Sequence, residues 1–95
     1  MKILVLGGTG FIGSNLINEL EKNNHKILSY SKSLGLDVKN YKRLSLTIKE
    51  FKPDIIFNVA SHGGSLHYVK EYAGDVFFDN VQMALNLYRA VKENS

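Results

Sequence analysis

The hydrophobic residues of the first thirty positions follow two different spacings. Residues 2–6 contain the continuous aliphatic run Ile3-Leu4-Val5-Leu6, which is typical of a strand buried on both faces of a parallel sheet. From Phe11 onward the apolar side chains recur every three or four positions, and this spacing predicts a helix. A second short strand is predicted at 26–30. The chain is therefore expected to begin with a strand, a helix and a strand.

The same alternation continues beyond residue 30. A brief third strand is predicted at Leu36-Asp37-Val38. Asn40 is then expected to cap a helix, and Pro53 to mark its end, because the residue before a proline avoids the helical conformation. A fourth strand is predicted at 54–59 and a long helix at 74–93. The long helix carries one broad apolar stripe, formed by Phe77, Val81, Ala84, Leu85, Tyr88 and Val91.

This order of elements predicts an α/β fold. Strands that alternate with helices form a parallel sheet, and right-handed crossovers place helices on both faces. We therefore expect a Rossmann-like, doubly wound parallel sheet. The sheet is expected to be partial, with about four strands in the order 3-2-1-4. Residues 1–95 contain no internal repeat or linker and are expected to form one domain.

Composition narrows the class of protein. An apolar share of 44% with a single proline favours a compact globular chain over a disordered one. The absence of cysteine excludes disulfides and thiolate metal sites and favours a reducing compartment, so we expect a cytoplasmic protein. The apolar run at 3–6 is too short for a signal peptide or a membrane span. No membrane partner is expected.

The net charge of +3 raises the possibility of a nucleic-acid partner. The basic residues are scattered, however, and no aromatic residues lie between them as a base-stacking surface would require. A solvated helix face explains their pattern better, and we expect no nucleic-acid binding. The residues concerned are Lys39, Lys42, Arg43, Lys49 and Lys52.

A glycine-rich turn carries the strongest functional signal. Gly8-Thr9-Gly10-Phe11-Ile12-Gly13 satisfies G-x-G-x-x-G, and Gly7 adds an overlapping spacing of three. The motif directly follows a predicted buried strand and opens a predicted helix, where free amides and the helix dipole attract phosphates. Glycines there permit a tight turn, a close approach of the pyrophosphate and close packing of the helix. The sequence therefore predicts a dinucleotide site, with a purely structural turn as the alternative.

The end of the second predicted strand bears on the choice of cofactor. An acidic residue at this point would bind the ribose 2′-hydroxyl of NAD, and none is present. The chain offers Lys32 instead, flanked by Ser31 and Ser33, and a cation with hydroxyls can hold a 2′-phosphate. This favours NADP over NAD, although an ordinary exposed loop is the alternative.

The motif and its surroundings resemble a known family. GGTGFIGSNL at 7–16 is similar to the opening of the extended short-chain dehydrogenases/reductases, which include nucleotide-sugar epimerases, dehydratases and reductases. The similarity extends along the whole chain. Its other landmarks are Leu36-Asp37-Val38, the stretch 53–60, Gly63-Gly64, Asp79-Asn80-Val81 and Asn86-Leu87.

The resemblance implies roles for particular residues. The glycine turn would hold the pyrophosphate, Asp37 and Val38 would border the adenine, and Ala60 and Ser61 would pass beside the nicotinamide ribose. Asn80 would steady the end of the fourth strand. The alternatives are a turn carboxylate for Asp37 and a surface helix residue for Asn80. The expected cofactor-binding residues are Gly7, Gly10, Phe11, Ile12, Gly13, Lys32, Asp37, Val38, Ala60, Ser61 and Asn80.

The resemblance also implies an activity, namely NAD(P)-dependent hydride transfer on a nucleotide-activated sugar. A non-catalytic NADP-binding or sensor module is the alternative. The family catalyses with a Tyr-x-x-x-Lys pair beyond a fifth strand. Tyr88 and Lys92 match this spacing, but they lie in the predicted last helix, and we expect the match to be accidental. No catalytic residue is therefore assigned.

Two further expectations follow from the resemblance. The chain would be the amino-terminal part of a longer enzyme, ending before the fifth strand and the substrate domain, and would be inactive alone. A homodimer would form through the last helix. His62 lies in a loop that faces the reacting groups in the family, but we expect it to be solvated, and no metal site is expected because His62 and His67 lack carboxylate or cysteine partners.

Overall fold

The computed structural model describes residues 1–60 and 71–94. Within these ranges the strands are β1 (Lys2–Leu6), β2 (Lys26–Tyr30) and β3 (Ile55–Asn58). The helices are α1 (Phe11–Glu21), α2 (Tyr41–Phe51) and α4 (Ala73–Glu93), with a short 3₁₀ helix, η1 (Lys32–Leu34), after β2. No helix in the described part of the chain is both long and apolar enough to cross a bilayer.

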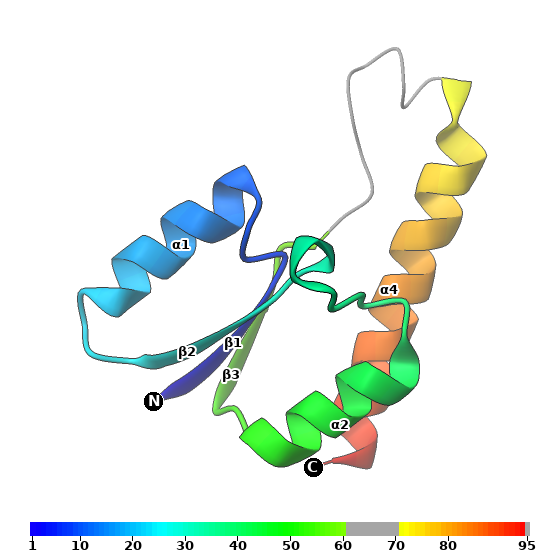
Figure 1. Ribbon diagram of the computed structural model, residues 1–95. Coiled ribbons are helices and arrows are strands. Elements are labelled where there is room, and N and C mark those ends of the chain that lie inside the picture. The colour runs from blue at the N-terminus through cyan, green and yellow to red at the C-terminus, as the bar shows by residue number, and fades with distance from the viewer. Residues whose placement is uncertain (61–70, 95) are drawn as a thin grey trace.

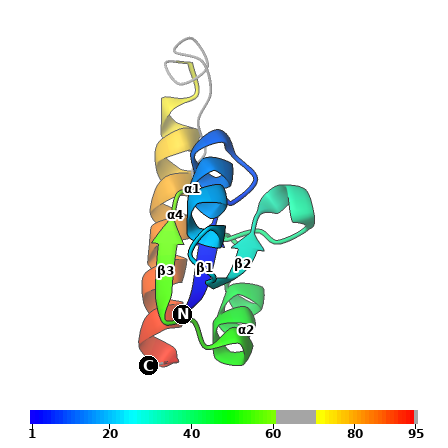
Figure 2. The same ribbon diagram turned by 90° about the vertical axis from the view of Figure 1, so that its left-hand side faces the viewer.

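The three strands form one parallel sheet in the order β2-β1-β3, so β1 is central. Leu4 of β1 pairs with Leu28 on one side and Ile56 on the other. Helix α1 covers one face of the sheet, and α2 and α4 lie together on the other (Figures 1 and 2). The predicted fold class, a partial Rossmann-like parallel sheet with helices on both faces, is confirmed.

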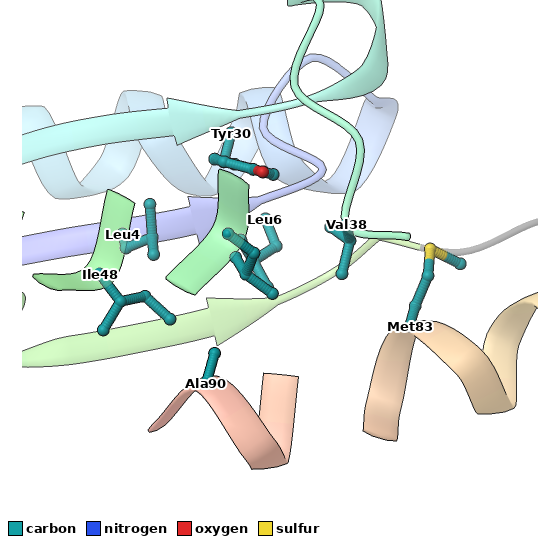
Figure 3. Close-up of a cluster of buried hydrophobic side chains, with 8 residues drawn as sticks. Leu4, Leu6, Tyr30, Val38, Ile48, Met83 and Ala90 are labelled. Carbon is teal, nitrogen blue, oxygen red and sulfur yellow. The ribbon is translucent and has the colours of Figure 1, made fainter. Parts of the chain in front are cut away.

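The central strand is buried on both faces, as its continuous aliphatic run predicts. Ile3 is 1% exposed, and Leu4, Val5 and Leu6 have no exposed surface. Alternate side chains of a strand point to opposite faces, so Leu4 and Leu6 share one face. They form the core beside α2 and α4 (Figure 3). The cluster consists of Leu4, Leu6, Tyr30, Val38, Leu44, Ile48, Met83 and Ala90.

The third strand predicted at 36–38 is wrong, so the described sheet lacks the outermost strand of the predicted order 3-2-1-4. The other three predicted strands lie in the predicted order, as β2-β1-β3. After β2 the chain forms the short helix η1. Gly35 caps the end of this helix, with a φ of 79° in the left-handed region. The Asp37 carboxylate then accepts a hydrogen bond from the Lys39 amide at 2.9 Å. The carbonyls of Val38 and Lys39 accept from Asn86 of α4. The backbone of this segment is therefore bonded to a turn and a helix instead of to the edge of β2.

The two ends of α2 agree with the sequence. Asn40 caps the helix, its side chain accepting a hydrogen bond from the Arg43 amide. Lys52 ends it in the left-handed conformation, with φ of 52°, immediately before Pro53.

Helix α2 also contacts α4, because the Tyr41 hydroxyl donates a hydrogen bond to Glu93. This hydrogen bond raises the pKa of Tyr41 and lowers the pKa of Glu93.

Helix α4 does not turn its most apolar stripe toward the sheet. Phe77 is 72% exposed and Tyr88 68% exposed, and Leu85 between them is also exposed. The face that packs in the core bears Met83, Asn86, Leu87 and Ala90 instead. The helix therefore has two faces with apolar residues, of which the larger points away from the described fold.

Candidate functional site

The glycine turn joins the end of β1 to α1 by close backbone contacts. Gly7 has φ of 83°, and its amide donates to the Tyr30 carbonyl at 2.8 Å. A Cβ atom at Gly7 would lie 2.7 Å from the Ala60 nitrogen, and one at Gly13 would lie 2.1 Å from the Gly7 oxygen. The first contact brings the ends of β1 and β3 together, and the second seats the first turn of α1 on the loop. Both glycines are therefore required by the fold itself.

Gly10 differs from its neighbours because the described fold does not require a glycine there. Its φ of −76° suits any residue, and a Cβ atom would have only the Gly7 oxygen, at 3.5 Å, as a described neighbour within 4 Å. Gly10 is the N-cap of α1, and no side chain in the described ranges caps this helix. The first-turn amides at Phe11 and Ile12 belong to an uncapped helix start, a position suited to an anion.

A cavity of about 590 Å³ opens in front of this helix start, which is within the usual range for a small-molecule site. Four segments line it: the glycine turn, parts of the stretch 30–39 that begins with the last residue of β2, Val59 and Ala60 directly after β3, and Asp79 and Met83 of α4. The cavity therefore lies at the carboxyl ends of all three strands, where open parallel sheets bind their ligands.

The structure places most of the residues expected from the sequence around this one cavity. Gly8 is not among the lining residues; a Cβ atom there would lie 2.2 Å from the Ser29 hydroxyl oxygen. Asn80 does not line the cavity either, although its neighbour Asp79 does, and Ser61 lies outside the described residues. The expected residues that do line it are Gly7, Gly10, Phe11, Ile12, Gly13, Lys32, Asp37, Val38 and Ala60.

Hydroxyl groups fasten the glycine turn to the loop after β2. The Thr9 amide donates to the Ser31 hydroxyl at 3.1 Å, and the hydroxyls of Thr9 and Ser33 lie 2.7 Å apart. Lys32 stands between the two serines and lines the cavity. The loop is thus hydrogen-bonded to the glycine turn, and the Lys32 side chain belongs to the wall of the same cavity.

Tyr30 and Asp37 form the inner part of the wall after β2. Tyr30 is fully buried, and its hydroxyl donates to the Asp37 carbonyl at 3.5 Å. Burial raises the pKa of the Tyr30 phenol, which keeps its proton and serves as a donor. Asp37 has a turn role, because its carboxylate accepts from the Lys39 amide, and it also lines the cavity.

Sequence reasoning placed Asn80 of α4 at the site, but it assigned no role to the α4 residues that line the cavity or hold its loop wall in place. Asn86 is only 6% exposed, and its Nδ2 donates to the Val38 carbonyl at 2.9 Å and the Lys39 carbonyl at 3.0 Å. Met83 is part of the core and also lines the cavity. The steps of three and four between Met83, Asn86, Leu87 and Ala90 were the available signal, but the more apolar stripe beside them concealed it.

We expect Asn86→Ala to lower the free energy of unfolding by about 1–3 kcal/mol, because it leaves the buried Val38 carbonyl without its donor. Urea unfolding would measure this. The matched control is Asn18→Ala on the exposed surface of α1, which should change the free energy by less than about 0.5 kcal/mol. Equal effects of the two substitutions would show that Asn86 does not anchor the loop.

Other candidate chemistry is not assembled at the cavity. Tyr88 and Lys92 do not line it, and Tyr88 is 68% exposed on α4. His62, Gly63, Gly64 and His67 lie outside the described residues. In the ranges that the structure describes, no three His, Cys, Asp or Glu side chains gather where they could hold a metal ion. No catalytic role is therefore assigned to a residue of the described cavity lining.

Comparison with known sequences gives a match along almost the whole chain. The model of the NAD dependent epimerase/dehydratase family matches residues 3–95. GDP-L-colitose synthase of Yersinia pseudotuberculosis is 30% identical over 95 residues, covering 100% of this chain and 30% of that protein. GDP-L-fucose synthase of Azorhizobium caulinodans is 32% identical over 88 residues, or 90% of this chain and 27% of that protein. The chain thus spans less than a third of the length of either relative.

Solved structures show the same fold. UDP-glucose 4-epimerase of Thermus thermophilus, in complex with NAD, superposes with a TM-score of 0.87 at 23% identity, over 99% of this chain and 34% of that one. A dTDP-4-dehydrorhamnose reductase of Clostridium acetobutylicum superposes with a TM-score of 0.82 at 25% identity, over 98% of this chain and 32% of that one.

Proposed function

This chain belongs to the NAD-dependent epimerase/dehydratase family, and from that membership we propose that its cavity binds a dinucleotide, NADP or NAD. The observation that carries the proposal is Gly10. Its lack of a side chain has no explanation in the packing of the described fold, yet it leaves the space before the uncapped start of α1 open. A pyrophosphate in that space would accept hydrogen bonds from the amides of Phe11, Ile12 and Gly13.

The remaining walls suit the other parts of a dinucleotide. The adenine would lie between the loop bearing Asp37 and Val38 and the face of α4 bearing Met83. The nicotinamide ribose would lie toward the end of β3 at Ala60, with Ser61 following. Asn80, on α4, would steady that end of the strand. A nicotinamide bound there would accept or donate a hydride.

We propose NADP as the preferred form. Strand β2 ends at the buried Tyr30 instead of at a carboxylate that could bind the 2′-hydroxyl of NAD. Lys32 lines the cavity beside Ser31 and Ser33, whose hydroxyls are already oriented by Thr9. A 2′-phosphate at this wall would find a cation and a hydroxyl donor.

Titration with NADPH and with NADH tests both points. We expect the chain to bind NADPH more tightly than NADH. We expect Gly10→Ala to fold like the parent chain but to bind at least about tenfold more weakly, because its methyl group would occupy the approach of the pyrophosphate. The control is Gly74→Ala, a glycine of α4 away from the cavity. If neither nucleotide binds, the proposed function is wrong.

For the whole protein we propose hydride transfer on a nucleotide-activated sugar. Two relatives are named as synthases of GDP-linked sugars, which supports this substrate class. Residues 1–95 would act as the cofactor-binding domain. Tyr88 and Lys92, which match the spacing of the family's catalytic pair, do not line the cavity, so we expect the chain alone to bind cofactor without turnover. Substrate binding and proton transfer would need further polypeptide.

We also propose that the chain forms a homodimer through α4. The exposed side chains of Phe77, Leu85 and Tyr88 form an apolar stripe that water would solvate poorly. We expect twice the monomer mass in light scattering at high concentration, and a shift toward monomer in Leu85→Asp. A monodisperse monomer of the unsubstituted chain at every concentration would contradict this proposal.

A further inference from the structure

An ion pair connects two walls of the cavity. Lys39 Nζ lies 3.6 Å from Asp79 Oδ2, and both residues line the cavity. Lys39 belongs to the turn before α2, and Asp79 belongs to α4. Their side chains are 37% and 24% exposed, so the pair is only partly open to solvent. The pair therefore connects the cavity wall formed by the loop at 36–39 to the cavity wall formed by α4.

The ion pair contacts α4 at a different place from Asn86. The amino-terminal half of α4 extends beyond the sheet (Figure 1), and Phe77 and Phe78 there are largely exposed. Asn86 holds the Val38 and Lys39 carbonyls, and Asp79 lies seven residues before it, about 10 Å further along the helix axis. The ion pair is thus a second contact between the same loop and helix, closer to the amino-terminal end of α4.

We propose that Lys39 and Asp79 form a strap that positions the amino-terminal half of α4 against the loop at 36–39. The strap sets how tightly the cavity closes on the adenosine half of the cofactor, so this inference rests on the proposed function. Lys39 and Asp79 are positioning residues, acting through the separation of the two walls. The nicotinamide half, near Ala60, is not between these walls and should not depend on the strap.

The test must separate position from charge. Removing either partner alone would change the net charge of the cavity wall and would alter the attraction for phosphates directly. The double variant Lys39→Gln/Asp79→Asn removes the strap without changing the net charge. The exchanged variant Lys39→Asp/Asp79→Lys restores a pair of opposite charges. The matched control is Lys22→Gln/Glu19→Gln, which removes an ion pair of 3.0 Å on α1, where neither residue lines the cavity.

Binding is measured with NADPH, adenosine 2′,5′-bisphosphate and nicotinamide mononucleotide. In the neutral double variant we expect NADPH and the bisphosphate to bind about two- to fivefold more weakly, with the mononucleotide unchanged. The exchanged variant should recover most of the loss, and the α1 control should bind like the parent chain. Unchanged affinity for the bisphosphate, or an equal loss for the mononucleotide, would overturn the inference.

Amide hydrogen exchange of the cofactor-free chain gives an independent answer. We expect faster exchange at residues 76–82 in the neutral double variant and recovery in the exchanged one. If the parent chain binds no dinucleotide, the proposed function fails while exchange still reports on the strap. Exchange that is identical in all variants would overturn the strap even if the cofactor binds.

Discussion

Replacing Gly13 with alanine is expected to lower the free energy of unfolding by about 3 kcal/mol and to abolish dinucleotide binding. The new Cβ atom would lie 2.1 Å from the Gly7 oxygen and 2.8 Å from the Gly8 Cα. Both neighbours are backbone atoms, so the clash cannot be relieved by rotating a side chain. The start of α1 would have to move away from the turn. Thermal or urea unfolding measures the first effect and titration with NADPH the second.

Gly74 and Gly10 serve as controls for the Gly13 substitution. At Gly74 no described atom lies within 4 Å of the Cβ position, so alanine there should leave the stability unchanged or raise it by up to about 1 kcal/mol. Gly10→Ala should weaken binding with little effect on stability. A Gly13→Ala chain that unfolds like the parent would show that α1 is not seated on the turn as described.

Leu44→Ala should cost about 2–5 kcal/mol in the free energy of unfolding. Leu44 has no exposed surface and belongs to the core between α2 and the sheet, so its truncation leaves a cavity. The loss should appear as a lower urea midpoint with an unchanged slope, since the surface exposed on unfolding remains the same.

Leu46 supplies the control on the same helix. It is 48% exposed, so Leu46→Ala makes the same chemical change outside the core. We expect a change of less than about 1 kcal/mol, because alanine is also a good helix former. Similar losses from the two substitutions would mean that α2 is not docked through Leu44.

The strands and helices could be predicted from the sequence wherever burial has a simple period. The run at 3–6 is buried on both faces of β1, and an unbroken aliphatic run is what that environment requires. Asn40 and Pro53 likewise act locally and mark the ends of α2. The tripeptide at 36–38 was misread because its apolar-polar-apolar pattern fits a strand. Its conformation is fixed by Asn86, a partner 48 positions away that local pattern cannot reveal.

Part of the lining of the cavity could also be predicted from the sequence. The glycine spacing located the turn, and strand order placed the loops after β2 and β3 near it. Of the helix wall only Asn80 was predicted, and it does not line the cavity. Asp79 and Met83 do line it, from the helix that Asn86 connects to the loop at 36–39. The stripe bearing Phe77 and Tyr88 was the stronger periodic signal in that helix, yet it faces away from the sheet. Periodicity identifies an apolar face without saying what covers it.

The backbone contact between Gly7 and Ala60 links the glycine turn to the order in which the chain is synthesised. A nascent polypeptide that has completed only β1, α1 and β2 carries the whole glycine motif, but the strand that supports it from the other side is still missing. Cofactor captured by the finished turn would stabilise only the assembled sheet. Under the proposed function, a completed chain supplied with the dinucleotide should therefore resist proteolysis better than the same chain without it.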